Sequence, residues 1–170
     1  MPRGVTKGKQ LLIIWHSFTG GAGQMARAAA SGAAQESEVR TRLLSARRAG
    51  PKDVLAADAV IFATPENLAA MTGIMKDFFD RCYYPVLGCI EGRAYASLIC
   101  AGSDGEAAAR QIARIAMGWR LREIAPPLII RTGAQMPEAI LTPKIIGAVE
   151  LARCAELGLT MASGLALGLF

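Results

Sequence analysis

The stretch Leu11-Leu12-Ile13-Ile14-Trp15, followed at once by His16-Ser17-Phe18-Thr19-Gly20-Gly21-Ala22-Gly23, decides the fold of this chain. A short, continuous apolar run is typical of a strand that is buried on both faces of a sheet. The run opens into a glycine-rich loop, and the alanine-rich segment Gln24–Ala34 then favours a helix. The order strand, glycine loop, helix predicts the first unit of a parallel sheet.

The same alternation of strand and helix continues to the end of the chain. We expect strands at Leu11–Trp15, Glu38–Leu44, Asp58–Ala63, Ala94–Cys100 and Ile124–Ile130. We expect helices at Gln24–Ala34, Lys52–Ala57 and Met71–Tyr84. A fourth helix should run from a capping box of Ser103 and Glu106 to about Trp119. A fifth should run from Lys144, with Thr142 as its N-cap, to about Ser163. The pattern predicts a single α/β domain over residues 1–170: a flavodoxin-like three-layer sandwich whose five-stranded parallel sheet has the order 2-1-3-4-5, with helices on both faces. Because Pro126 and Pro127 cannot donate backbone hydrogen bonds, the fifth strand belongs at a sheet edge.

Composition excludes several classes of protein. With 170 residues, 52% of them hydrophobic, the chain can bury a core and is not intrinsically disordered. A net charge of +5 from scattered basic residues is too weak to indicate nucleic-acid binding. One histidine and four cysteines without Cys-x-x-Cys spacing argue against a zinc site. No segment reaches the roughly 18 apolar residues of a membrane helix, so we expect a cytoplasmic protein without membrane insertion.

In a parallel sheet of this kind, ligands bind beyond the carboxyl ends of the strands. This rule selects three loops, His16–Gly23, Thr64–Thr72 and Ala101–Gly105. The first has the composition of a phosphate-binding loop, because glycines let backbone N–H groups converge at a helix N-terminus and Ser17 and Thr19 add hydroxyl groups.

Several kinds of loop compete for this first segment. A Walker loop fails, because Gln24 and Met25 follow the last glycine in place of lysine and Ser/Thr. The dinucleotide fingerprint Gly21-x-Gly23-x-x-Ala26 is a weak match, and basic Arg47 and Arg48 stand where the ribose-binding acid is expected. A receiver-type domain would need acidic residues that this segment lacks. A flavodoxin-type loop, in which hydroxyl and N–H groups surround a phosphate monoester, fits best, and a tight turn without a ligand is the structural alternative.

Two further segments carry a resemblance to a known family. Phe62-Ala63-Thr64-Pro65-Glu66-Asn67, followed by Met71-Thr72-Gly73-Ile74-Met75-Lys76-Asp77-Phe78-Phe79-Asp80-Arg81, resembles the second loop and helix of flavodoxin-like NAD(P)H-dependent oxidoreductases. Ala101–Gly105 is similar to the glycine-rich loop beside the flavin ring in that family, which includes WrbA-like quinone reductases and NADPH-dependent FMN reductases. The resemblance covers nearly the whole chain.

The resemblance implies that FMN is the cofactor and that the site uses all three loops. The cofactor-binding candidates are Ser17, Phe18, Thr19, Gly20, Gly21, Ala22, Gly23 and Gln24 for the phosphate, Thr64, Pro65, Glu66 and Asn67 for the ribityl chain and ring, and Gly102, Ser103, Asp104 and Gly105 for the pyrimidine end. No catalytic side chain and no metal are expected, because the flavin itself carries the electrons. Glu66 either orients the cofactor or caps the following segment. His16 contacts the phosphate, protonates a quinone or packs in the loop.

The expected function is an FMN-dependent oxidoreductase that passes electrons from NADH or NADPH to a quinone, free flavin or another small acceptor. The alternative is a non-catalytic flavin- or nucleotide-binding module on the same fold, acting as a sensor or partner protein. The uncharged C-terminal run Leu157–Phe170, together with the resemblance, favours a homodimer or homotetramer.

Overall fold

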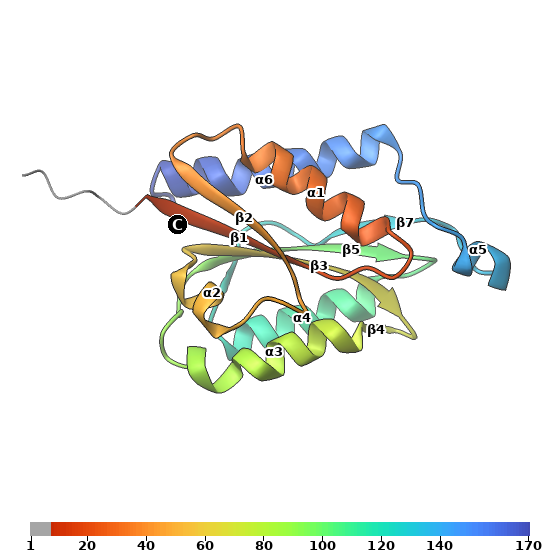
Figure 1. The fold of residues 1–170 in the computed structure, drawn as a ribbon, viewed down its shortest axis with the longest axis horizontal. Coiled ribbons are helices and arrows are strands. Elements are labelled where there is room, and N and C mark those ends of the chain that lie inside the picture. The colour runs from red at the N-terminus through yellow and green to blue at the C-terminus, as the bar shows by residue number, and fades with distance from the viewer. Residues whose placement is uncertain (1–7) are drawn as a thin grey trace, which may run out of the picture.

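The computed structural model describes residues 8–170, which form three layers with a twisted sheet in the middle (Figure 1). The strands are β1 (Lys9–Trp15), β2 (Val39–Ser45), β3 (Ala59–Asn67), β4 (Ala70–Met71), β5 (Ala94–Ala101), β6 (Arg122–Glu123) and β7 (Leu128–Arg131). The helices are α1 (Gly21–Ala33), α2 (Pro51–Ala56), α3 (Gly73–Val86), α4 (Glu106–Gly118), α5 (Pro137–Leu141) and α6 (Ala148–Ala166). Within the described residues, no helix is long and apolar enough to cross a membrane.

The sheet has the predicted order. Its path runs β2-β1-β3-β5, with β6 and β7 both parallel to β5 at the far edge, and β4 adds a short antiparallel pair to β3. The expected fifth strand Ile124–Ile130 is wrong over residues 124–127, which are not in a strand: β6 ends before them and β7 begins after them. Pro126 and Pro127 lie in this gap, where their missing N–H groups interrupt the ladder.

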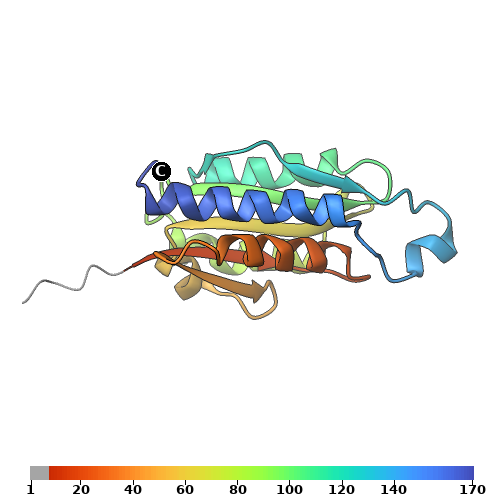
Figure 2. The ribbon, with the colours of Figure 1, turned by 90° about the horizontal axis from the view of Figure 1, so that it is seen from above.

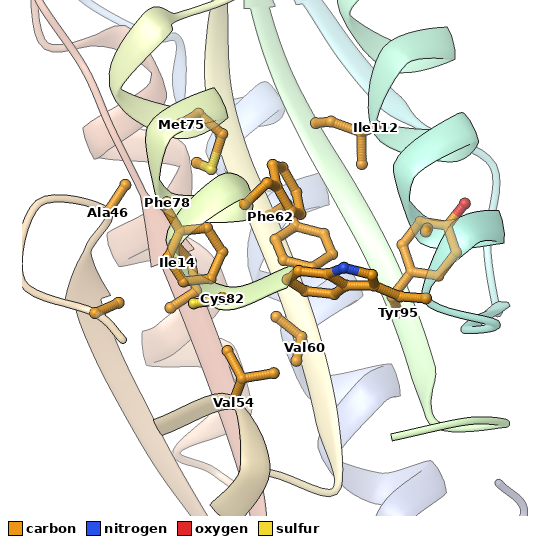
Figure 3. Close-up of a cluster of buried hydrophobic side chains, with 14 of the residues drawn as sticks. Ile14, Ala46, Val54, Val60, Phe62, Met75, Phe78, Cys82, Tyr95 and Ile112 are labelled. Atoms are coloured by element: carbon orange, nitrogen blue, oxygen red, sulfur yellow. The ribbon is translucent and has the colours of Figure 1, made fainter. Parts of the chain in front are cut away.

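Each face of the sheet has its own apolar core. Helices α2, α3 and α4 cover one face, where Phe62 of β3 meets Phe78 of α3 and Ile112 of α4 (Figure 3). Helices α1 and α6 cover the other face and lie side by side (Figure 2). The α1–α6 contact is a backbone-to-backbone crossing, because a methyl group on Gly32 would lie 1.9 Å from the carbonyl oxygen of Ala155.

Several of the expected helix starts are wrong. Helix α1 begins at Gly21 instead of Gln24, and α3 begins at Gly73 instead of Met71. The last helix begins at Ala148, after its N-cap Gly147, instead of at Lys144. Thr142, expected as its N-cap, follows α5, where its hydroxyl group donates to the carbonyl oxygen of Glu138 at 2.6 Å. At α4 the expected capping box is also absent: the N-cap is Gly105, and Ser103 is exposed.

Candidate functional site

A cleft of about 520 Å³ opens at the carboxyl ends of β1, β3 and β5, which is where all three predicted loops meet. This volume lies in the range typical of small-molecule sites. The residues that line it are Phe18, Thr19, Pro65, Glu66, Asn67, Leu68, Ala69, Cys100, Ala101, Gly102, Ser103, Thr132, Ala134, Ile140, Leu141 and Lys144. Each of the three predicted loops thus contributes to one cleft.

The predicted residues divide into those that line the cleft and those that shape its walls. The lining members are Phe18, Thr19, Pro65, Glu66, Asn67, Gly102 and Ser103. The remaining members lie in the same loops outside the lining set: Ser17, Gly20, Gly21, Ala22, Gly23, Gln24, Thr64, Asp104 and Gly105.

The first loop is closed by a hydroxyl group and a left-handed glycine. Gly20 has a φ of 91° and ends the loop as the N-cap of α1, and its N–H donates to Ser17 Oγ at 3.0 Å. Because Ser17 Oγ accepts this bond, its own proton stays free to donate to an anion. The N–H groups of the first turn, Gly21 to Gly23, have no acceptor within the helix and face its N-terminal end.

Gln24 joins the first loop to the segment before α6. Its Nε2 donates to the carbonyl oxygens of Gly20 at 3.0 Å and Lys144 at 2.7 Å, while its Oε1 accepts the N–H of Ile146 at 3.1 Å. The amide group is therefore used in holding the loop and residues 144–146 together. Its observed role is to position the loop, and direct contact with a phosphate stays a prediction.

The second loop is a β-hairpin that the sequence analysis did not predict. Strand β3 continues through Thr64 and Pro65 to Asn67 and turns back into β4, where Glu66 pairs with Met71. The expected end of this strand at Ala63 is wrong, because Thr64 and Pro65 keep their register with β5. The two turn residues Leu68 and Ala69 have φ of 51° and 57°, and the side chain of Leu68 is fully exposed at the rim of the cleft.

This turn is strained, so a better turn sequence should stabilise the protein. Two-residue hairpin turns with two positive φ angles favour Asn-Gly, and ordinary L residues pay a steric cost there. We expect the double substitution Leu68→Asn/Ala69→Gly to raise the free energy of unfolding by about 1 kcal/mol, measured by urea denaturation. The matched control is Ala70→Gly in β4. Ala70 has no positive φ to relieve, so this substitution should lower the free energy of unfolding. Equal signs for the two variants would contradict the strain.

Glu66 ties the second loop to the third. Its Oε1 accepts the N–H of Gly105 and its Oε2 accepts the N–H of Ala108, both at 2.9 Å. Of the two roles considered for Glu66, the structure shows capping, although the helix that it caps is α4 and not the segment that follows it in sequence. A carboxylate at the N-terminus of a helix is also favoured by the helix dipole.

The third loop runs close to the segment that follows β7. A methyl group on Gly102 would lie 2.4 Å from the carbonyl oxygen of Ala134, and the N–H of Gly133 donates to the carbonyl oxygen of Gly102 at 2.8 Å. Gly105 has a φ of 92°, which glycine adopts without strain. Ser103 and Asp104 are exposed beside the cleft.

The segment of residues 132–147, which includes α5, projects beyond the ends of the strands (Figures 1 and 2). Its residues form a fourth wall of the cleft, which was not predicted from the sequence. The N–H of Lys144 donates to the carbonyl oxygen of Thr19 at 2.7 Å, which fixes the end of the segment to the first loop. Its Nζ donates to the carbonyl oxygens of Ala139 and Ile140 at 2.8 and 2.9 Å, so the lysine also holds α5 in place. The only signal in the sequence was the Thr142-Pro143 pair, which looked like a helix start.

His16 packs behind the first loop and does not line the cleft. It is 6% exposed, and its ring meets that of Phe18 edge-on with 4.6 Å between the centroids. Burial, and to a lesser extent the charge of Arg47, lower the pKa of His16 below its usual value of 6.5, so the ring is neutral at pH 7. Its Nδ1 is buried without a hydrogen-bond partner among residues 8–170. The structure shows the packing role, and contact with a phosphate or a quinone stays a prediction.

Comparisons with known proteins agree with this architecture. Residues 47–130 match the family model of the NADPH-dependent FMN reductases. A flavodoxin of Aquifex aeolicus is 30% identical over 96 residues, covering 56% of this chain and 52% of its own length. An NAD(P)H dehydrogenase (quinone) of Acidithiobacillus ferrooxidans is also 30% identical, covering 42% of this chain and 46% of its own length. The chain thus spans about half the length of these curated relatives.

Solved structures resemble nearly the whole chain. An archaeal flavodoxin superposes with a TM-score of 0.75 at 18% identity, covering 92% of this chain and 99% of that one. A WrbA-like flavodoxin from Agrobacterium tumefaciens superposes with a TM-score of 0.73 at 17% identity, covering 94% and 98%. These superpositions show that the chain has a flavodoxin-like fold. Within that class, the matched model confirms the predicted resemblance to the flavodoxin-like NAD(P)H-dependent FMN reductase family.

Proposed function

We propose that the chain binds FMN in the cleft and is an oxidoreductase that passes electrons from NAD(P)H to a small acceptor such as a quinone or free flavin. The observation that carries this proposal is the first loop, where a free hydroxyl proton, a left-handed glycine and the N-terminal N–H groups of α1 meet beside the cleft. The match of residues 47–130 to NADPH-dependent FMN reductases supports the same cofactor and donor.

The cleft and the first loop offer groups for two parts of FMN, its phosphate and its ring. The phosphate would accept hydrogen bonds from Ser17, from Thr19 and from the first N–H groups of α1, where the helix dipole favours a negative charge. The ring would lie between the hairpin Glu66–Met71 and the third loop, which Glu66 holds at a fixed separation. When bound, the flavin would supply the two-electron chemistry.

The walls of the cleft explain how an acceptor could be selected. Phe18, Leu68 and Leu141 are exposed at its rim, with 62%, 101% and 76% of their surfaces accessible. Apolar side chains around a site favour planar, weakly polar ligands and displace water from the ring that they cover. The lining therefore favours an apolar acceptor over a highly charged one.

A double substitution in the first loop tests the phosphate assignment. We expect Ser17→Ala/Thr19→Ala to weaken FMN binding about 10- to 100-fold, because hydrogen bonds to a charged group are stronger than neutral ones. Riboflavin, which lacks the phosphate, should bind the variant and the parent protein equally in the same fluorescence titration. Unchanged FMN affinity, or an equal loss for riboflavin, would contradict the phosphate site.

A further inference from the structure

A basic turn, residues 46–49, lies directly beside the first loop of the cleft. It follows the carboxyl end of β2, and the N–H of Ala46 donates to the carbonyl oxygen of Trp15, the last residue of β1, at 2.8 Å. The first loop begins at the next residue, His16. The turn and the cleft thus share the same end of the sheet.

The backbone of the basic turn is fixed by hydrogen bonds to Ser45 at its start and to Arg81 of α3. The N–H groups of Arg48 and Ala49 donate to the carbonyl oxygen of Ser45 at 3.0 and 2.9 Å. Arg81 of α3 donates to the carbonyl oxygens of Ala46 at 2.6 Å and Ala49 at 2.8 Å. Ala46 and Ala49 are buried, whereas Arg47 and Arg48 between them are exposed. The turn therefore presents two arginine side chains from a fixed backbone.

These two arginines have no acidic partner in the structure. Nearby carboxylates are already engaged, since Asp53 pairs with Arg42 at 2.8 Å and Asp77 pairs with Arg81 at 2.7 Å. Among residues 8–170, no carboxylate lies within 4.0 Å of the guanidinium group of Arg47 or Arg48. Exposed arginines without partners offer forked donors that match a phosphate group.

The basic turn is linked to the cleft through His16 and Phe18. The charge of Arg47 acts on His16, whose ring meets Phe18, and Phe18 lines the cleft. A ligand with one end in the cleft and a phosphate at the basic turn would pass the exposed ring of Phe18. That geometry suits an extended dinucleotide better than a compact anion.

We propose that Arg47 and Arg48 bind the 2′-phosphate of NADPH while its nicotinamide end enters the cleft. This inference rests on the proposed function, because it takes the donor to be a nicotinamide dinucleotide. A phosphate monoester carries close to two negative charges at neutral pH, which two unpaired guanidinium groups can neutralise. NADH lacks this group, so the basic turn is the element that makes the chain prefer NADPH.

The test compares nucleotides that differ in the 2′-phosphate, titrated calorimetrically into the protein as purified. We expect 2′,5′-ADP to bind at least about tenfold more tightly than 5′-AMP, and Arg47→Ala/Arg48→Ala to remove that difference without changing the affinity for 5′-AMP. Arg47→Lys/Arg48→Lys keeps the positive charge and should keep part of the difference in affinity between the two nucleotides. The control Arg40→Ala/Arg114→Ala removes two exposed arginines that lie away from the basic turn, and it should leave the difference in affinity between the two nucleotides unchanged.

The same variants also give a kinetic result. The ratio of kcat/KM for NADPH to that for NADH should fall about tenfold or more in the alanine variant, while FMN affinity stays unchanged. The proposal is overturned if the parent protein binds 2′,5′-ADP and 5′-AMP equally, or if the alanine variant still prefers 2′,5′-ADP. It is also overturned if the control variant loses this preference. A protein that binds no flavin would refute the proposed function, and the calorimetric comparison would still decide the role of the basic turn.

Discussion

Gly158→Ala lowers the free energy of unfolding by about 2–3 kcal/mol if α1 and α6 pack as the structure shows, although alanine is the better helix former by about 1 kcal/mol. A methyl group at this position would lie 1.9 Å from the carbonyl oxygen of Ala29 in α1. The two helices would have to separate, and their apolar contacts with the sheet would loosen. Thermal unfolding should shift down by roughly 4–12 °C.

A matched glycine in another helix provides the control. Gly118 of α4 has no atom within 4 Å of the place where its methyl group would lie, so Gly118→Ala should be neutral or stabilising. The double variant Gly32→Ala/Gly158→Ala should lose less than the sum of the two single losses, because one separation of the helices relieves both clashes. Stabilisation by Gly158→Ala would show that the crossing is looser than described.

Glu66→Ala is expected to lower the free energy of unfolding by about 2–4 kcal/mol and also to weaken FMN binding. The substitution leaves two N–H groups at the start of α4, those of Gly105 and Ala108, without their charged acceptor. It also disconnects the hairpin from the third loop, so the two sides of the cleft are no longer held together. Urea denaturation measures the first effect and a flavin titration the second.

Two further variants separate capping from general charge effects. Glu66→Gln keeps one acceptor oxygen and should fall between the parent protein and the alanine variant. Glu106→Gln removes a carboxylate from the first turn of the same helix, but this side chain is exposed and, among residues 8–170, pairs only with Arg131 at 3.3 Å. We expect it to cost less than about 1 kcal/mol. A loss as small as this for Glu66→Ala would contradict the link between the loops.

The sheet was predictable from sequence because its strands are continuous apolar runs bounded by loops. Leu11–Trp15 and Ala94–Cys100 were placed to within two residues, and their parallel neighbours follow from the alternation with helices. The first loop was also predictable, since its glycines and hydroxyl groups directly follow a buried strand. The site itself was found by the rule that ligands bind at the carboxyl ends of strands.

What could not be predicted depends on contacts between segments that are distant in sequence. Glu66 caps a helix that starts 40 residues later, as the hydrogen bond from Gly105 over 39 positions shows, and local capping rules pointed to Ser103 instead. Lys144 is joined to Gln24 of the first loop across 120 positions, and the one local pattern in residues 132–147, Thr142-Pro143, indicated a helix start instead of a wall of the cleft. The cytoplasmic location and the assembly into a dimer or tetramer stay predictions.

Addition of FMN followed by desalting tests the central claim most directly. The protein should keep a visible flavin absorption band, which NADPH bleaches under anaerobic conditions and a quinone then restores. A retained band that NADPH does not bleach would favour a non-catalytic flavin-binding module. A protein that keeps no flavin, and that does not oxidise NADH or NADPH even when free FMN is supplied, would contradict the account.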